Sequence, residues 1–105
     1  MRGDVYRLRS NREARGHEQR GVRYAVVVQS DHLLLSTTLV APTSTSARAT
    51  SFRPSIVMDG ITTLVLADQV TAVDGETRIG EFVGRLSAEE LAEVDRALKL
   101  VLGLR

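Results

Sequence analysis

The side chains that could do chemistry in this chain gather in three short segments, each next to an apolar run. The segments read GHEQRGVR (16–23), VAPTS (40–44) and ADQV (67–70). Each places polar groups at or near the end of an expected strand, which is the rigid support that a binding or catalytic side chain needs. Alone, each segment is also compatible with ordinary turn or surface chemistry, because Thr, Ser and Asp are common there.

Arg23 is the best supported candidate of the three segments. It lies between a long polar stretch that contains Gly16 and Gly21 and an apolar run of Val residues that begins after Tyr24. An Arg side chain presents a planar fork of N–H donors that matches the oxygens of a phosphate group. We therefore interpret Arg23 as a phosphate ligand held at the start of a buried strand.

Other reaction types have little support in the sequence. The chain has no Cys, and its two His residues, His17 and His32, do not have the spacing of a metal site. No Gly-rich phosphate loop follows an expected strand, and no Ser-His-Asp order stands out. We expect neither a metal nor a cofactor.

Positive charge is concentrated at the N-terminal end. Residues 1–23 hold seven Arg against three acidic residues, a net charge of +4, and the whole chain carries only +1. Thirteen of the fourteen cationic residues are Arg, the type best suited to phosphate. This distribution predicts a local anionic partner, and the alternative is a solvated Arg-rich loop.

Length and composition predict one folded domain that spans residues 1–105. The chain is 43% hydrophobic and 26% charged, as ordinary globular proteins are. The absence of Cys favours the cytoplasm. No apolar segment follows Met1–Asp4 as in a signal peptide, and no apolar run approaches the roughly 20 residues that span a membrane.

Apolar runs separated by turn signals predict a chain of short strands. The turn signals are Asp59-Gly60 and Asp74-Gly75, and Pro42 is expected to end a strand. Residues 9–22 and 42–51 are polar and are expected to be long loops. The expected strands are residues 4–8, 24–29, 33–41, 52–58, 64–70 and 77–83.

The C-terminal residues predict a helix. Ser87 and Glu90 have the spacing of a capping box, and Gly103 is placed as a helix-ending residue. An apolar stripe at helical spacing is expected to pack on the sheet, and Leu100 on the opposite side is a candidate contact for a partner. The stripe consists of Leu91, Val94, Leu98, Val101 and Leu102. Together these patterns predict a mainly β (α+β) fold, a strongly curved antiparallel sheet or small open barrel with a C-terminal helix.

Six segments in register give the chain a resemblance to the MazF/PemK toxin family. They start with RGDVY (2–6) and GHEQRGVRYAVVVQSD (16–31), and continue with VAPTS (40–44) and LADQVTAVD (66–74). Arg78 with VGRLS (83–87), and the final helix ending in LGL (102–104), complete the series. The resemblance covers nearly the whole chain.

This resemblance implies a compact SH3-like barrel that forms homodimers. It also implies the toxin of a type II toxin–antitoxin pair, which cuts single-stranded RNA at short sequences without a metal. The catalytic positions of the family fall on Arg23 and Thr43. Family RNA-binding positions and their neighbours fall on His17, Glu18, Gln19, Arg20, Ser44, Asp68 and Gln69.

The implied chemistry suits these residue types. In metal-free cleavage the RNA 2′-hydroxyl attacks the adjacent phosphorus, and a fixed guanidinium stabilises the charge that builds on the phosphate oxygens. Arg23 fills that role, and Thr43 can donate a further hydrogen bond. Family members commonly have Ser where His17 stands and Pro where Tyr24 stands, so His17 could supply an acid or base.

The expected partners are single-stranded RNA, a second copy of the chain and a short, acidic, partly disordered antitoxin. The mRNA, tRNA or rRNA target and its recognised sequence are left open. Three other functions also remain open. The first is a non-nuclease toxin similar to CcdB, which binds DNA gyrase, the second a non-catalytic nucleic-acid-binding domain, and the third a degenerate toxin that still binds antitoxin.

Overall fold

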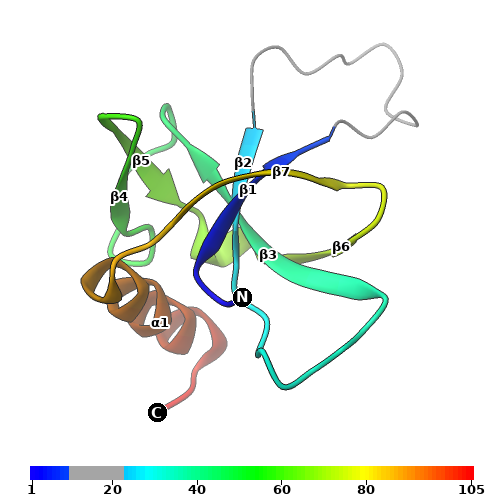
Figure 1. Cartoon of the computed structure of the whole chain (residues 1–105). Helices are drawn as coiled ribbons and strands as arrows, with labels where there is room; N and C mark the ends of the chain where they lie inside the picture. The colour runs from blue at the N-terminus through cyan, green and yellow to red at the C-terminus, as the bar shows by residue number, and fades with distance from the viewer. Residues whose placement is uncertain (10–22) are drawn as a thin grey trace, which may run out of the picture.

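The structure, a computed structural model, describes residues 1–9 and 23–105. Within these ranges the chain forms seven strands, a short 3-10 helix and one α-helix (Figure 1). Their bounds are β1 Asp4–Leu8, β2 Arg23–Val27, β3 Thr37–Ser44, β4 Ser55–Met58, β5 Ile61–Val65, η1 Ala67–Gln69, β6 Thr71–Asp74, β7 Ile79–Arg85 and α1 Ala88–Leu102.

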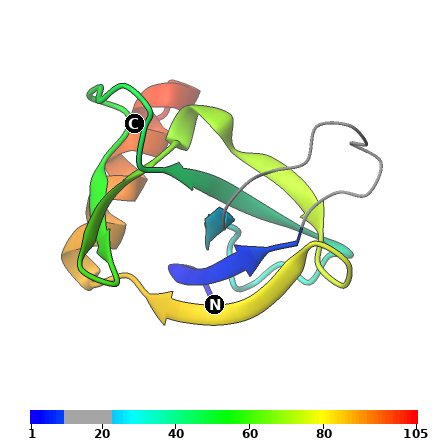
Figure 2. The same ribbon diagram turned by 90° about the horizontal axis from the view of Figure 1, so that it is seen from above.

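The strands form one antiparallel sheet that curls on itself. Its order is β4-β5-β3-β2-β1-β7, and β6 pairs with the first half of β3. Strand β3 pairs with two strands in succession. Its first half, Thr37–Val40, pairs with β6, and its end, Thr43 and Ser44, pairs with β5. Figure 2 shows the resulting half-barrel with α1 beside β4 and β5. The expected curved antiparallel fold with a C-terminal helix is confirmed.

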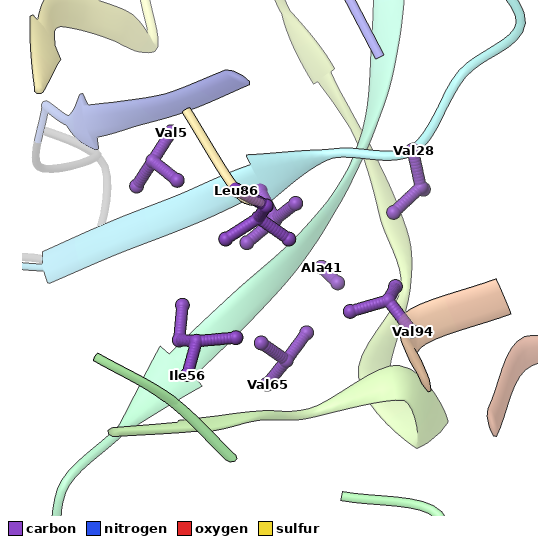
Figure 3. Close-up of a cluster of buried hydrophobic side chains, with 8 residues drawn as sticks. Val5, Val28, Ala41, Ile56, Val65, Leu86 and Val94 are labelled. Atoms are coloured by element: carbon purple, nitrogen blue, oxygen red, sulfur yellow. The ribbon is translucent and has the colours of Figure 1, made fainter. Parts of the chain in front are cut away.

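The central strand β2 is buried on both faces, which explains its unbroken apolar sequence. Val26 belongs to a first cluster inside the curl, to which α1 contributes Val94 (Figure 3). Ala25 and Val27 point to the opposite face and pack in a second cluster with Val40 and Val73. The first cluster consists of Val5, Val26, Val28, Ala41, Ile56, Val65, Leu86 and Val94.

Helix α1 has the predicted ends. The Ser87 hydroxyl accepts a hydrogen bond from the Glu90 amide, the Glu90 carboxylate accepts one from the Ser87 amide, and Gly103 is left-handed with a φ of 70°. The apolar stripe of the helix is less buried than expected. Val94 is fully buried, but Val101 and Leu102 are 39% and 63% exposed. The last turn therefore extends beyond the sheet.

The predicted end of a strand at Pro42 is wrong. Strand β3 runs through Pro42 to Ser44. Pro42 lies opposite Ala25, and its carbonyl accepts a hydrogen bond of 2.8 Å from the Leu66 amide. A missing N–H is tolerated here because β3 changes its partner at this point, from β2 to β5.

The expected strand at residues 64–70 is also only partly correct. The strand β5 ends at Val65, and the next residues form η1, in which the Gln69 amide donates to the Leu66 carbonyl. Strand β6 was not predicted, because Thr71–Asp74 is short and half polar. Of the expected loop at residues 9–22, only Arg9 is described, and it follows the end of β1; residues 10–22 lie outside the described residues. No helix in the described part of the chain is long and apolar enough to cross a membrane.

Candidate functional site

Arg23 and Thr43 lie at the same end of the sheet. Strand β2 begins at Arg23 and antiparallel β3 ends at Ser44, so these two termini are neighbours (Figure 1). The register between β2 and β3 ends with the pair of Ala25 and Pro42, one residue before Thr43 and two residues after Arg23. The Thr43 hydroxyl donates a hydrogen bond of 3.0 Å to the main-chain carbonyl of Tyr24, and Tyr24 is the residue that follows Arg23.

The pleat aims the two side chains at different faces. Arg23 shares a face with Ala25 and Val27, which pack in the second cluster. Thr43 pairs with Val65, a member of the first cluster inside the curl. Arg23 is exposed at the strand terminus, and Thr43 is half-buried.

Ser44 has a local structural role at this end of β3. Its hydroxyl oxygen accepts hydrogen bonds from the amides of Ser46 and Ala47, at 3.1 and 2.9 Å. This turn starts the connection from β3 to β4. The hydroxyl proton of Ser44 remains a donor, because an oxygen that accepts two bonds still carries its O–H.

Asp68 and Gln69 lie on η1. The residue before η1, Leu66, donates its amide to the Pro42 carbonyl and so holds this helix next to β3. Gln69 is exposed. Asp68 binds Arg53 in a bidentate pair, accepting from Nε at 3.0 Å and from Nη2 at 2.9 Å. The hydrogen bonds from Arg53 lower the pKa of Asp68 despite the opposing effect of burial.

The sequence did not single out Arg53. It lies in a stretch that was expected to start a strand, and it is 15 residues from Asp68 along the chain. Opposite charges at such a separation carry no periodic signal, so only the fold could pair them. The side chain also lies over the ring of Phe52, with 5.8 Å to the centroid.

Further arginines extend the positive surface beside Arg23. Leu8 pairs with Arg23 across the ladder, and its chain neighbours are Arg7 on β1 and Arg9 just after the end of β1. Arg78 joins them, because its Nε donates to the Arg9 carbonyl at 2.9 Å and its own carbonyl accepts from the Arg9 amide at 2.8 Å. From the sequence, these arginines were known only as basic residues, and their position near Arg23 is visible only in the structure.

The remaining predicted site residues, His17, Glu18, Gln19 and Arg20, lie outside the described residues. The fold therefore brings Arg23, Thr43 and Ser44 together, with Asp68 and Gln69 on the adjoining turn. Within residues 1–9 and 23–105, no group of three or more His, Cys, Asp or Glu side chains could hold a metal ion.

Comparisons with known proteins agree over the whole length. The family model of the PemK-like, MazF-like toxins of type II toxin–antitoxin systems matches residues 1–102. A candidate toxin of Mycobacterium tuberculosis is 40% identical over 104 residues, which cover 99% of this chain and 98% of that protein.

Solved structures show the same fold. MazF from Deinococcus radiodurans has a TM-score of 0.77 at 28% identity, covering 98% of this chain and 96% of its own. A mycobacterial endoribonuclease, solved in complex with its cognate antitoxin, has a TM-score of 0.75 at 21% identity, covering 100% of this chain and 96% of its own.

Proposed function

The chain belongs to the PemK-like, MazF-like family of toxins of type II toxin–antitoxin systems, and we propose that it is a metal-independent endoribonuclease. The proposed substrate is single-stranded RNA, cut by attack of a 2′-hydroxyl to leave a 2′,3′-cyclic phosphate and a 5′-hydroxyl. The observation that carries the proposal is the hydrogen bond from the Thr43 hydroxyl to the carbonyl of Tyr24, the residue that follows Arg23 at the start of β2.

Arg23 is proposed to stabilise the transition state. Its exposed guanidinium projects from the first residue of a strand that is buried from Ala25 onward, so its backbone is held rigidly. A prepositioned cation acts on the charge that develops on the phosphate oxygens. Because an Arg is in effect always charged in proteins, this role suits it better than proton transfer.

Thr43 is proposed to act with Arg23 in two ways. Its hydroxyl holds the Tyr24 carbonyl in the structure described here, which fixes the backbone next to Arg23. A rotation of the same hydroxyl would let it donate to a phosphate oxygen instead. Ser44, Gln69 and the residues His17, Glu18, Gln19 and Arg20 are proposed to bind the RNA on either side of the cut.

A cognate antitoxin and a second copy of the chain are the proposed protein partners, and the cytoplasm the proposed location. The mycobacterial neighbour and MazF from Deinococcus radiodurans were each solved with an antitoxin. Exposed leucines provide apolar area for such partners. They are Leu33, Leu34, Leu35, Leu39, Leu100, Leu102 and Leu104.

One cleavage experiment tests the proposal. The purified protein is incubated in EDTA with a panel of single-stranded RNAs, beside the same RNAs carrying a 2′-deoxy sugar at each cut site. We expect the all-ribose RNA to be cut and the 2′-deoxy sites to resist. Arg23→Ala should abolish cutting, whereas Arg105→Ala, at the exposed end of the chain, should cut at the wild-type rate.

The alternative functions give different results in the same preparation. A protein that cuts no RNA in the panel but inhibits DNA gyrase in a supercoiling assay would be a gyrase poison. One that binds RNA with strong salt dependence and leaves it intact would be a non-catalytic RNA-binding domain. One that binds only its antitoxin would be a degenerate toxin.

A further inference from the structure

We infer that Arg53 is a positioning residue for RNA cleavage, and that Asp68 acts through Arg53 rather than through its own contact with RNA. The inference rests on the proposed nuclease function, and it assigns a residue that lies outside the predicted site. Arg53 stands in the connection between β3 and β4, and Asp68 stands on η1. Their pair would hold this connection in place beside Thr43.

Arg53 and Asp68 form a bidentate ion pair that joins two segments of the chain, and we call this pair the latch. Arg53 Nε and Nη2 each donate to a different carboxylate oxygen of Asp68, at 3.0 and 2.9 Å. The two side chains are 18% and 27% exposed and the pair lies at the surface, so it depends on its bidentate geometry rather than on burial. Bidentate Arg–carboxylate pairs fix direction as well as distance.

Two other donors of Arg53 bond to main-chain carbonyls within its own segment. Nη1 donates to the Arg48 carbonyl at 3.1 Å, and the Arg53 amide donates to the Thr50 carbonyl at 3.2 Å. Arg96 of α1 donates to the Ser51 carbonyl from the other side. One guanidinium therefore closes residues 48–53 into a compact turn and fastens that turn to η1.

This turn is joined to the candidate site at both of its ends. The connection leaves β3 at Ser44, next to Thr43, and returns at Pro54, whose carbonyl accepts from the Val65 amide at 2.8 Å. Val65 is the register partner of Thr43. Movement of residues 48–53 would therefore be transmitted to Thr43 along the chain and across the sheet.

The same geometry argues against direct RNA contact by Asp68. Each of its oxygens already accepts a bond from Arg53, which leaves fewer lone pairs for RNA, and a negative charge at this position does not favour the phosphates of an approaching RNA. Gln69, which is neutral and exposed, is better placed to meet a base from this turn. Asp68 would then contribute to cleavage by holding Arg53, which shapes the neighbouring surface.

A double-mutant cycle separates the two roles of Asp68. The kcat and KM of RNA cleavage are measured for Asp68→Asn, Arg53→Gln and the double variant. If Asp68 acts through Arg53, each single change lowers kcat/KM by about tenfold or more, and the double variant is no slower than the worse single. Arg53→Lys, which keeps the charge without the fork, should restore only part of the loss.

Two results of the cycle would overturn the inference. One is a double variant whose loss equals the product of the single losses. The other is a changed RNA sequence preference in Asp68→Asn that Arg53→Gln does not share, since that would indicate a carboxylate that contacts a base. Asp59→Asn serves as the control, because Asp59 is an exposed acid in the β4–β5 turn.

A second measurement tests the latch without RNA. Trypsin cuts poorly before Pro, so Arg53-Pro54 resists it and Arg48-Ala49 is the informative bond of the turn. We expect Asp68→Asn to be cut at Arg48 several-fold faster than the wild type, and Asp59→Asn to be cut at the wild-type rate. Equal rates for Asp68→Asn and the wild type would overturn the latch.

The two measurements also separate failure of the inference from failure of the proposed function. A wild-type protein that cuts no RNA, together with faster trypsin cleavage in Asp68→Asn, overturns the nuclease proposal and the positioning role while the latch stands. An active wild type with Asp68→Asn unchanged in both assays overturns the inference and leaves the nuclease proposal intact.

Discussion

The Thr43 hydroxyl donates its proton to the main-chain carbonyl of Tyr24 at 3.0 Å. This bond ties the end of β3 to the residue that follows Arg23, where family members commonly have Pro. A Pro restricts the backbone by its ring, whereas here a side-chain hydrogen bond restrains the same position. The bond links the two proposed catalytic residues through the backbone.

Substitutions at Thr43 should therefore separate its hydroxyl from its shape. We expect Thr43→Val, which keeps the volume, to lower kcat by about 100-fold or more, as loss of a transition-state donor does. Thr43→Ser should retain most of the activity. RNA cleavage rates measure the effect, with thermal unfolding as the check on folding. A Thr43→Val protein that cuts at the wild-type rate would remove Thr43 from the mechanism.

His17 provides a test of the proton-transfer step, although it lies outside the described residues. If it acts as acid or base, His17→Ala slows cleavage and removes one inflection from the pH–rate profile. His32→Ala is the matched control, because His32 is the only other imidazole in the chain. An unchanged profile in His17→Ala would exclude His17 from proton transfer.

Glu90 joins the start of α1 to β4, since its second oxygen accepts from the Val57 amide at 3.0 Å. Burial raises the pKa of Glu90, but the Ser87 and Val57 amides and the Ser87 hydroxyl outweigh it and lower the pKa. We expect Ser87→Ala to lower the unfolding free energy by about 1 kcal/mol. Glu90→Ala should cost about 2 kcal/mol, because it also releases Val57.

Urea unfolding at neutral pH measures both costs, and Glu89→Ala, in the same turn and exposed, is the control. The contribution of Glu90 belongs to its ionised form. It is therefore present above the unfolded pKa of about 4.3 and is lost as the pH falls through the lower folded pKa. Equal costs for Ser87→Ala and Glu90→Ala would show that the bond to Val57 contributes no stability.

Asp4 should make the protein sensitive to acid. Its buried carboxylate accepts from Arg85 Nε at 2.7 Å and from the N-terminal ammonium at 3.0 Å. Burial raises the pKa of Asp4, but these hydrogen bonds and positive charges outweigh it and lower the pKa. Stability from this site is thus complete above an unfolded pKa of about 3.9 and is lost as the pH falls through the folded pKa.

We expect Asp4→Asn to lower the unfolding free energy by about 1.5–3 kcal/mol at neutral pH. The difference from the wild type should shrink below about pH 4. Chemical unfolding at several pH values measures it, and Glu81→Gln on the exposed side of β7 is the control. A difference that stays constant down to pH 2 would contradict the assignment.

Gly60 is required by the β4–β5 hairpin. Asp59 and Gly60 form a two-residue turn between Met58 and Ile61, and both have positive φ, 50° and 76°. A Cβ at Gly60 would meet no atom within 4 Å, so a substitution there changes only the backbone preference. We expect Gly60→Ala to cost about 1–2 kcal/mol of stability.

Gly84 is a matched control for this prediction, because it also has open space around it but lacks a positive φ. Gly84→Ala should be neutral or slightly stabilising in thermal unfolding. Equal destabilisation by the two substitutions would contradict a conformational role for Gly60.

Sequence alone determined the features that depend on neighbours along the chain. The capping box at Ser87 and Glu90, the helix end at Gly103 and the Asp59-Gly60 turn are local, because each is made by residues at most five positions apart. The apolar run after Arg23 marked the central strand, since a strand covered on both faces must be apolar throughout.

Only the tertiary structure decided which residues meet across the sheet. Pro42 stays within β3 because Leu66, far along the chain, donates to its carbonyl, and no local rule could reveal that partner. The sequence already marked Arg23 and Thr43 as candidates, but only the structure showed that the Thr43 hydroxyl bonds to the carbonyl of Tyr24, the residue next to Arg23. The pairing of Arg53 with Asp68 likewise depends on the fold, because attraction between charges depends on distance in space and not on their order in the chain.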